Sequence, residues 1–284
     1  MSMAVSVVTD ATLLTLTLVL ATLGLAIIFG LIGVINMGHG ALLTLGAYFT
    51  WLAAGYGIPF VLAVVLAAIG VAAVGCAFEH VIVRHFYDQP FDTLLLTWGF
   101  FLVTTEVIKI LFGANIKSVA NPIPGAWTVG AVSLPAYQSV ISAIALVLLG
   151  ATALIIFRTT LGIKVRALVQ HREMASLLGL NAGHVYKLVF TAGAGLAGLA
   201  GALLSPLISV QPDIGNIYLI RAFFVVIVGG VGQLFAGTLV GSFLLGGSET
   251  IVSLATSQVV AQTVVFALAI LVLRFRPSGV LASR

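Results

Sequence analysis

Charge is scarce in this sequence. Asp, Glu, Lys and Arg together make up 7% of its 284 residues, whereas soluble globular domains contain about 25% charged residues. Hydrophobic residues account for 61% of the chain, and the mean hydropathy is +1.24. So few charges cannot cover a water-exposed surface. The composition therefore excludes an ordinary soluble domain and predicts a membrane protein.

Cysteine and recognisable catalytic motifs are also lacking. Cys76 is the only cysteine, which excludes an intrachain disulfide and leaves no Cys/His spacing suited to a metal ion. The sequence contains no Gly-x-x-x-x-Gly-Lys-Ser/Thr loop for a nucleotide, and we find no convincing catalytic constellation. We therefore expect a chain that is not an enzyme and that has no metal, no bound cofactor and no nucleic-acid partner.

Long apolar runs account for most of the sequence. A helix needs about 20 residues to cross the hydrocarbon core of a bilayer, and several runs approach or exceed that length. Short polar turns separate the runs, and Lys117–Pro135 is a longer loop rich in Pro, Gly and Asn. The runs lie at 12–35, from the following polar break through Ala54, and at 58–79, 93–112, 137–157, 188–209 and 258–273.

The stretch 220–252 has a different pattern. It is apolar but is interrupted at Gly229–Gln233, and about 33 residues are marginal for two full spans at a rise of about 1.5 Å per residue. We predict a broken or re-entrant hairpin, surrounded by other helices because irregular backbone inside a bilayer needs protein or water as a partner. The predicted fold is all-α: a single polytopic transmembrane helical bundle, residues 1–284, with about eight membrane segments.

The cations predict the orientation of the chain. Most lie in the charged interval 158–187, in the tail after residue 273, and at Arg84. The positive-inside rule places these regions in the cytoplasm, with the N-terminus outside and the C-terminus inside. With these two ends fixed, the number of spans requires the stretch 220–252 to enter and leave the membrane on the same face. Arg221, with Gln211 and Asp213, then lies on the outer side, where we expect ordinary solvated turn residues.

A polar break containing glycine follows the first apolar run. Asn36 and His39 interrupt apolar sequence there, and a polar group without a partner is costly inside a bilayer. They are candidates for a translocation path; alternatively, Asn36 caps the next helix by accepting a hydrogen bond from Gly38 or His39. Thr97 and Trp98 offer a hydroxyl and an indole N–H in the fourth run and are further candidates for this path.

Small residues recur at four-residue spacing in two segments. This spacing gives a flat helix face that permits close contact between helices, so we predict packing faces. A face that lines a path or slides during gating would have the same pattern. The residues are Gly193, Ala197 and Gly201 in one segment and Gly237 and Gly241 in the other.

One pair of opposite charges lies inside an apolar run. Glu106 and Lys109 are three residues apart in the run 93–112. Residues at this spacing share a helix face, so we predict an intrahelical ion pair near the outer interface.

The charged interval 158–187 contains a recognisable motif. Arg166-Ala167, followed by Glu173-Met174-Ala175-Ser176-Leu177-Leu178-Gly179-Leu180, resembles the EAA-type coupling motif of ABC-transporter permeases. The chain looks most like the branched-chain amino acid permease family, and the resemblance covers nearly its whole length. Met174, where a second alanine is common, and Gly38 depart from the family pattern. Further stretches that resemble this family are 33–40, 193–201, 229–232 and 274–279.

The resemblance implies a function and a set of partners. It implies the permease subunit of an importer in the inner membrane of a bacterium, which moves leucine, isoleucine and valine by alternating access. Its partners would be a second permease subunit, identical or different, two cytoplasmic ATP-binding subunits that use the ATP, an extracytoplasmic solute-binding protein and membrane lipid. A short helix around Glu173–Gly179 would couple the ATPases to the spans. The implied coupling residues are Arg166, Glu173, Ala175 and Gly179.

Three alternatives stay open. The same resemblance includes permeases for urea and short-chain amides, and Thr97-Trp98-Gly99 looks like a segment of that branch. An ATP-independent channel or secondary transporter would use Asn36 and His39 as its filter, although the charged interval argues against it. A structural scaffold without transport activity is the last alternative, against which the costly polar break argues.

Overall fold

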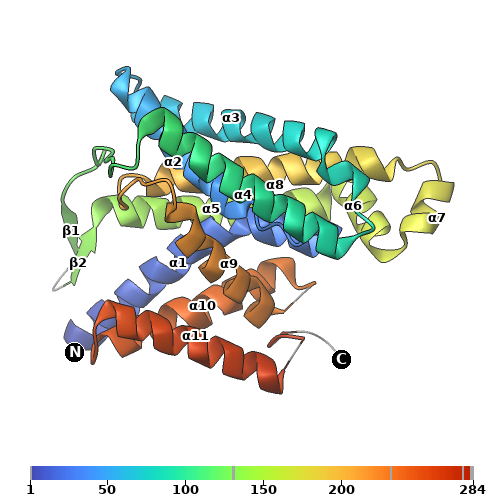
Figure 1. Ribbon diagram of the computed structural model, residues 1–284. Coiled ribbons are helices and arrows are strands. Elements are labelled where there is room, and N and C mark those ends of the chain that lie inside the picture. Colours follow the sequence, from blue (N-terminus) through green and yellow to red (C-terminus); the bar gives the residue numbers. More distant parts are fainter. Residues whose placement is uncertain (1, 130–131, 231, 277, 282–284) are drawn as a thin grey trace. The chain divides into compact units, whose positions relative to one another are not determined.

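The computed structural model is almost entirely helical, which confirms the predicted all-α class (Figure 1). It describes residues 2–129, 132–230, 232–276 and 278–281. Within these ranges, 7 helices are long and apolar enough to cross a membrane, so the chain is a polytopic membrane protein. The helices are α1 (Ser2–Ile32), α2 (His39–Gly55), α3 (Phe60–Val81), α4 (Pro90–Phe112), α5 (Ala136–Arg158), α6 (Thr160–Gln170), α7 (Arg172–Leu177), α8 (Ala182–Leu204), α9 (Ile214–Gly229), α10 (Leu234–Ser253) and α11 (Gln258–Phe275), with a short 3-10 helix η1 (Val83–His85).

The helix starts follow from local sequence. Pro90 begins α4, where its missing N–H costs nothing because the first turn has no intrahelical acceptor for it. The Asn181 side chain accepts a hydrogen bond from the N–H of His184 at 3.0 Å and so caps α8. This cap explains why α8 begins at Ala182 rather than at the predicted residue 188.

Two segments between the predicted spans contain regular structure. The charged interval 158–187 is largely helical, because Thr159 caps α6 by accepting from the N–H of Gly162 at 3.3 Å, and α7 follows directly. The helix predicted around Glu173 is thereby confirmed. In the loop Lys117–Pro135, strands β1 (Ala126–Val129) and β2 (Val132–Pro135) pair antiparallel, with Ala126 opposite Pro135.

Backbone contacts group the chain into two compact units. The α10–α11 unit contains the first 22 residues, Asn121–Leu149 and Ile220–Arg284, and the α3–α8 unit contains Leu23–Ala120 and Gly150–Leu219. The single domain predicted for residues 1–284 stays a prediction.

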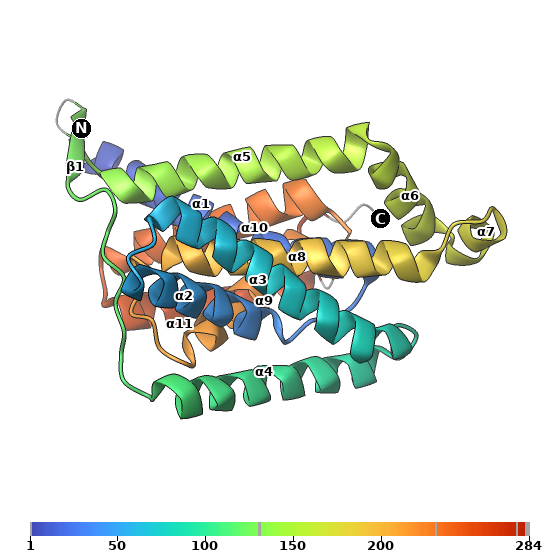
Figure 2. The same ribbon diagram turned by 90° about the horizontal axis from the view of Figure 1, so that it is seen from above.

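In the α3–α8 unit, helix α8 packs against both α2 and α3 (Figure 2). The contact is so close that a Cβ at Gly201 would overlap the carbonyl group of Leu43 on α2, and a Cβ at Gly46 would overlap that of Gly198. Ala197 is 0% exposed between them. Gly193 lies in a similarly close contact, with Gly24 and Ile28 of α1. The packing face of Gly193, Ala197 and Gly201 stays a prediction, with which these contacts agree.

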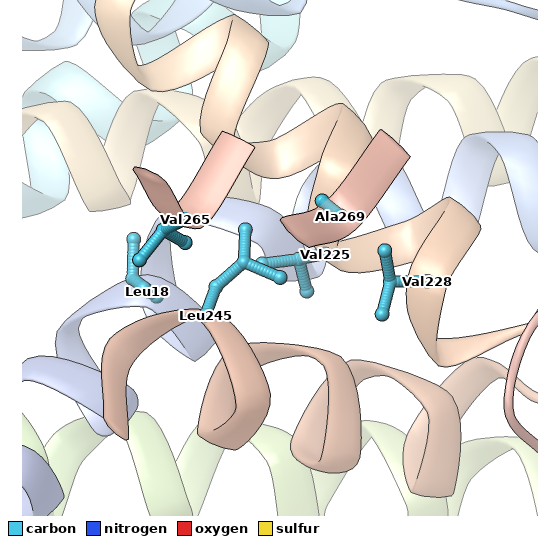
Figure 3. Close-up of a cluster of buried hydrophobic side chains, with 6 residues drawn as sticks. All are labelled: Leu18, Val225, Val228, Leu245, Val265 and Ala269. Atoms are coloured by element: carbon cyan, nitrogen blue, oxygen red, sulfur yellow. The ribbon is translucent and has the colours of Figure 1, made fainter. Parts of the chain in front are cut away.

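In the α10–α11 unit, six buried apolar side chains from α1, α9, α10 and α11 converge (Figure 3). Each is at most 4% exposed. Close approach of α9 and α10 permits this convergence, since a Cβ at Gly241 would overlap the carbonyl of Val225. Gly229 likewise meets the backbone of Gly237, in agreement with the packing role predicted for Gly237 and Gly241. The six are Leu18, Val225, Val228, Leu245, Val265 and Ala269.

The break predicted inside 220–252 is present between α9 and α10. The C-terminal segment lies on it: the N–H of Val280 donates to the carbonyl oxygen of Val228 at 2.9 Å. Gly279 has φ +88° and no room for a Cβ against Gly230, so glycine is required there. The tip of the hairpin thus lies beside the end of α11, and α10 alone has the length of a span. Helix α9, with 16 residues, is shorter than a span, so the hairpin is broken as predicted.

Gly201→Ala should destabilise the protein, because its new methyl group has no space against the backbone of α2. We expect the free energy of unfolding to fall by about 1–3 kcal/mol, the usual cost of overpacking. Gly99→Ala in α4 is the matched control, since a Cβ at Gly99 has no neighbour within 4 Å. Thermal unfolding of the purified variants measures both. Equal melting temperatures for the two variants would contradict the close packing.

Candidate functional site

The break between α1 and α2 is held by side-chain hydrogen bonds. Oδ1 of Asn36 accepts from the N–H of Gly38 at 3.0 Å, and the N–H of His39 donates to the Asn36 carbonyl at 3.3 Å. The Thr97 hydroxyl of α4 accepts from the N–H of Met37 at 3.0 Å. The predicted bond from Asn36 to Gly38 is confirmed. These hydrogen bonds pair backbone N–H groups that have no helical partner in this non-helical segment. Such pairing is required inside a bilayer.

We call Asn36, His39 and Thr97 the helix-break cluster. All three side chains are at most 1% exposed. The amide nitrogen Nδ2 of Asn36 has no hydrogen-bond partner among the described residues, although burying such a donor unpaired is costly. The cluster therefore contains an unused donor that a polar solute or a water molecule could satisfy. Its role in a translocation path stays a prediction.

Trp98 is not brought into this cluster by any contact that the structure records. Its ring stacks on Phe101 of the same helix, with the centroids 5.2 Å apart. The second residue of α4 at the break is instead Phe100, whose ring would lie 2.9 Å from a Cβ at Gly38. The adjacent residues Thr97 and Trp98 cannot both face the break, because successive residues of a helix point about 100° apart.

The segment Arg172–Leu180, which we call the coupling segment, presents an apolar end to the surroundings. Met174, Leu177 and Leu178 are 65%, 82% and 85% exposed, and Glu173 is exposed beside them. Exposed apolar side chains that are clustered in this way typically mark a surface for another protein. Figure 1 shows α7 projecting at the end of α6 and α8.

The other predicted coupling residues have local roles. Ala175 is 4% exposed and packs inward. Gly179 ends the segment with φ +85°, and the N–H of Leu180 donates to the Ala175 carbonyl at 3.1 Å in a glycine-terminated helix end. The Arg166 guanidinium lies 5.5 Å from the centre of the Phe157 ring. Glu173 is therefore the charged member of the set that faces outward from the coupling helix.

The predicted ion pair between Glu106 and Lys109 is confirmed, with 2.8 Å between Oε1 and Nζ. Both side chains are exposed, at 64% and 40%. An exposed pair of this kind contributes only about 0.3–0.5 kcal/mol.

Arg221 is not a solvated turn residue, so that expectation is wrong. It lies in α9, and its guanidinium contacts Oε1 of Glu249 on α10 at 3.0 Å. The two side chains are only 13% and 6% exposed. Charges buried among apolar helices must be paired, and this pair also joins the two arms of the hairpin. In the sequence, one feature pointed to this partner for Arg221: Glu249 is the only acidic residue after Asp213.

Comparison with known proteins identifies the family. The family model described as "Branched-chain amino acid transport system / permease component" matches residues 7–273. The chain belongs to this family. The permease is 30% identical over 287 residues to the high-affinity branched-chain amino acid transport system permease protein LivH of Escherichia coli K12, covering 93% of this chain and 91% of that protein.

Two further relatives are also described as branched-chain amino acid transport permease proteins. The permease is 30% identical over 282 residues to BraD of Pseudomonas aeruginosa, again with 93% and 91% of the two chains covered. A probable LivH of Methanocaldococcus jannaschii is 29% identical over 100 residues, which is 35% of this chain and 31% of that one. No solved structure matches the chain.

Glu249→Gln should destabilise the permease strongly, because it leaves the Arg221 guanidinium buried without a counter-charge. Breaking such a pair costs about 3–5 kcal/mol, whereas replacing both partners by apolar residues is often close to neutral. The double variant Arg221→Met with Glu249→Met should therefore be more stable than Glu249→Gln alone. Thermal unfolding in detergent measures the difference. A double variant that loses at least as much stability as the single one would contradict a buried pair.

Proposed function

We propose that this chain is the transmembrane permease subunit of an ATP-driven importer for leucine, isoleucine and valine. The observation that carries the proposal is the match to LivH and BraD, both described as branched-chain amino acid permeases, over 93% of the chain. The exposed apolar end of the coupling segment supports it, since a free-standing channel has no use for such a surface.

The proposed partners follow from what this chain provides and what it needs. ATP is used by two separate ATP-binding subunits, because the sequence has no nucleotide-binding loop of its own. Those subunits dock on the coupling segment, where Glu173, Leu177 and Leu178 are exposed. A second permease subunit completes the path, and a solute-binding protein delivers the solute from outside.

The proposed orientation places the coupling segment and the C-terminus in the cytoplasm and the N-terminus outside. The cations Arg158, Lys164, Arg166, Arg172 and Lys187 in and around the coupling segment support this orientation by the positive-inside rule. The helical hairpin of α9 and α10 returns to the face it leaves, which the same count requires. For a bacterial chain, the membrane is the cytoplasmic one.

The proposed mechanism is alternating access. When ATP draws the two ATP-binding subunits together, they move α7, and α7 is joined to α8 by only four residues. Since α8 packs on α2, the movement reaches the helix-break cluster at the start of α2. The unpaired amide of Asn36 is then available to a passing solute, and glycine contacts permit the helices to slide because no side chain obstructs them.

Uptake into vesicles that carry the permease with its partner subunits should require ATP and favour leucine over urea. Each labelled solute is supplied with its cognate binding protein, and vesicles without ATP are the control. Urea uptake that depends on ATP would move the permease to the urea branch. Flux of either solute without ATP would contradict the importer.

Glu173→Lys should abolish co-purification of the ATP-binding subunits and ATP-dependent uptake, because it reverses the charge at the exposed face of α7. The matched control is Glu106→Lys, which makes the same change at an exposed glutamate on α4. We expect uptake by the control to stay close to that of the unchanged permease. Intact co-purification and uptake with Glu173→Lys would exclude a docking role for this residue.

A further inference from the structure

A cavity of about 330 Å³ lies at the base of the coupling segment. The ends of α3 and α8, the turn around η1, and α7 line it together. Three of its lining residues are permanent cations, Arg84, Arg172 and Lys187, and only Glu79 is acidic. The imidazoles of His80 and His184 and the polar side chains of Tyr87, Asn181 and Tyr186 also line it.

The cations of this cavity are only partly neutralised. Arg172 pairs with Asp88 and lies 5.6 Å from the centre of the Tyr186 ring. Arg84 contacts a ring nitrogen of His80 at 3.1 Å. The ion pairs recorded within residues 2–129, 132–230, 232–276 and 278–281 give neither Arg84 nor Lys187 a carboxylate partner. The cavity is therefore a site of positive charge.

The N-terminus of α8 adds to this field. Helix α8 has 23 residues and begins at Ala182, and Gly183 and His184 of its first turn line the cavity. The N–H of His184 is already bonded to the Asn181 side chain. The helix dipole still favours an anion at such a position, and together with three cations it is suited to phosphate.

Glu79, the only acidic residue that lines the cavity, can accept a further hydrogen bond. Glu79 is 1% exposed, and its Oε1 accepts from the Tyr87 hydroxyl at 2.7 Å. Burial, followed by this hydrogen bond, raises the pKa of Tyr87, so the phenol stays a donor at neutral pH. Oε2 has no partner among the described residues. A ligand that carries an N–H donor in addition to phosphate would satisfy this oxygen.

The surroundings of the cavity are apolar on the membrane side. α3 is a candidate span, and Ile69 and Val81 on it are 62% and 65% exposed. Acyl chains cover such a surface in a bilayer, whereas a free anion has no contact with it. Val81 directly follows His80 of the cavity, so the apolar surface of α3 begins next to the cavity. A molecule with a polar head and apolar tails matches such a boundary.

We propose that this cavity binds the headgroup of a membrane phospholipid that carries a primary ammonium. Arg84, Lys187 and Arg172 hold the phosphate, and Glu79 accepts from the ammonium. Since Arg172 directly precedes Glu173, the bound lipid connects the coupling segment to the bilayer. The site does not depend on which solute the permease transports.

The test measures lipid retention by the purified permease. Delipidated protein is mixed with equal amounts of phosphatidylethanolamine and phosphatidylcholine, and native mass spectrometry counts the molecules that remain bound. Phosphatidylethanolamine should be preferred, because the quaternary ammonium of phosphatidylcholine has no N–H to donate to Glu79. Glu79→Gln should reduce this preference while phosphate binding persists.

The double variant Arg84→Gln with Lys187→Gln should retain both lipids at least about tenfold more weakly, as expected when charge-assisted hydrogen bonds are lost. Arg158→Gln is the control, because Arg158 is an exposed cation outside the cavity. Arg84→Lys with Lys187→Arg keeps both charges and should restore retention, which separates a binding defect from misfolding.

Three outcomes would overturn the proposal. The first is equal retention by the unchanged permease and the double Gln variant. The second is complete displacement of the lipid by excess inorganic phosphate, which would identify a site for a free anion instead. The third is no preference for phosphatidylethanolamine over phosphatidylcholine, which would exclude the ammonium contact with Glu79.

Discussion

Close backbone contact between helices is the constraint on which the rest of this structure depends. Inside a bilayer there is no hydrophobic force between helices, so packing and polar contacts must hold them together. Here α8 touches α2 and α3 where glycines replace side chains, with Gly201 against Leu43 and Gly46 against Gly198. The same device joins α9 to α10. A larger residue at these positions would push apart α8 and α2, or α9 and α10.

Buried polar groups lie at the helix break before α2 and between the closely packed helices α9 and α10. The helix-break cluster lies at the start of α2, next to α4, and its backbone groups are satisfied by Asn36 and Thr97. Glu249 and Arg221 form an ion pair inside the α9–α10 hairpin. Each polar group is costly among apolar helices unless it is paired. The amide of Asn36 and one carboxylate oxygen of Glu79 are among the buried polar atoms without a partner in the described residues, so a solute or a lipid could gain by pairing with them.

Sequence reasoning succeeded where the signal was local. Long apolar runs predicted the spanning helices, the Asn36 bond depends on residues two apart, and Glu106–Lys109 share one helix turn. It failed where contacts between distant parts of the chain, or the rotation of a helix, determine a residue's surroundings. Arg221 looked like a surface residue because its partner Glu249 lies 28 residues away, and Trp98 looked equivalent to Thr97 because sequence alone does not give the rotation of α4. The strands β1 and β2 were missed because each has only four residues.

The central claim is that separate ATP-binding subunits drive this bundle through the exposed end of α7. Photocrosslinking tests it most directly, with a photoreactive amino acid replacing Leu177, which is 82% exposed, or Ile116 beyond α4, which is 67% exposed. In membranes that contain the partner subunits, we expect the residue at 177 to crosslink to an ATP-binding subunit and the residue at 116 not to do so. No crosslink from 177 while ATP-dependent uptake is intact, or equal crosslinks from both positions, would contradict the claim.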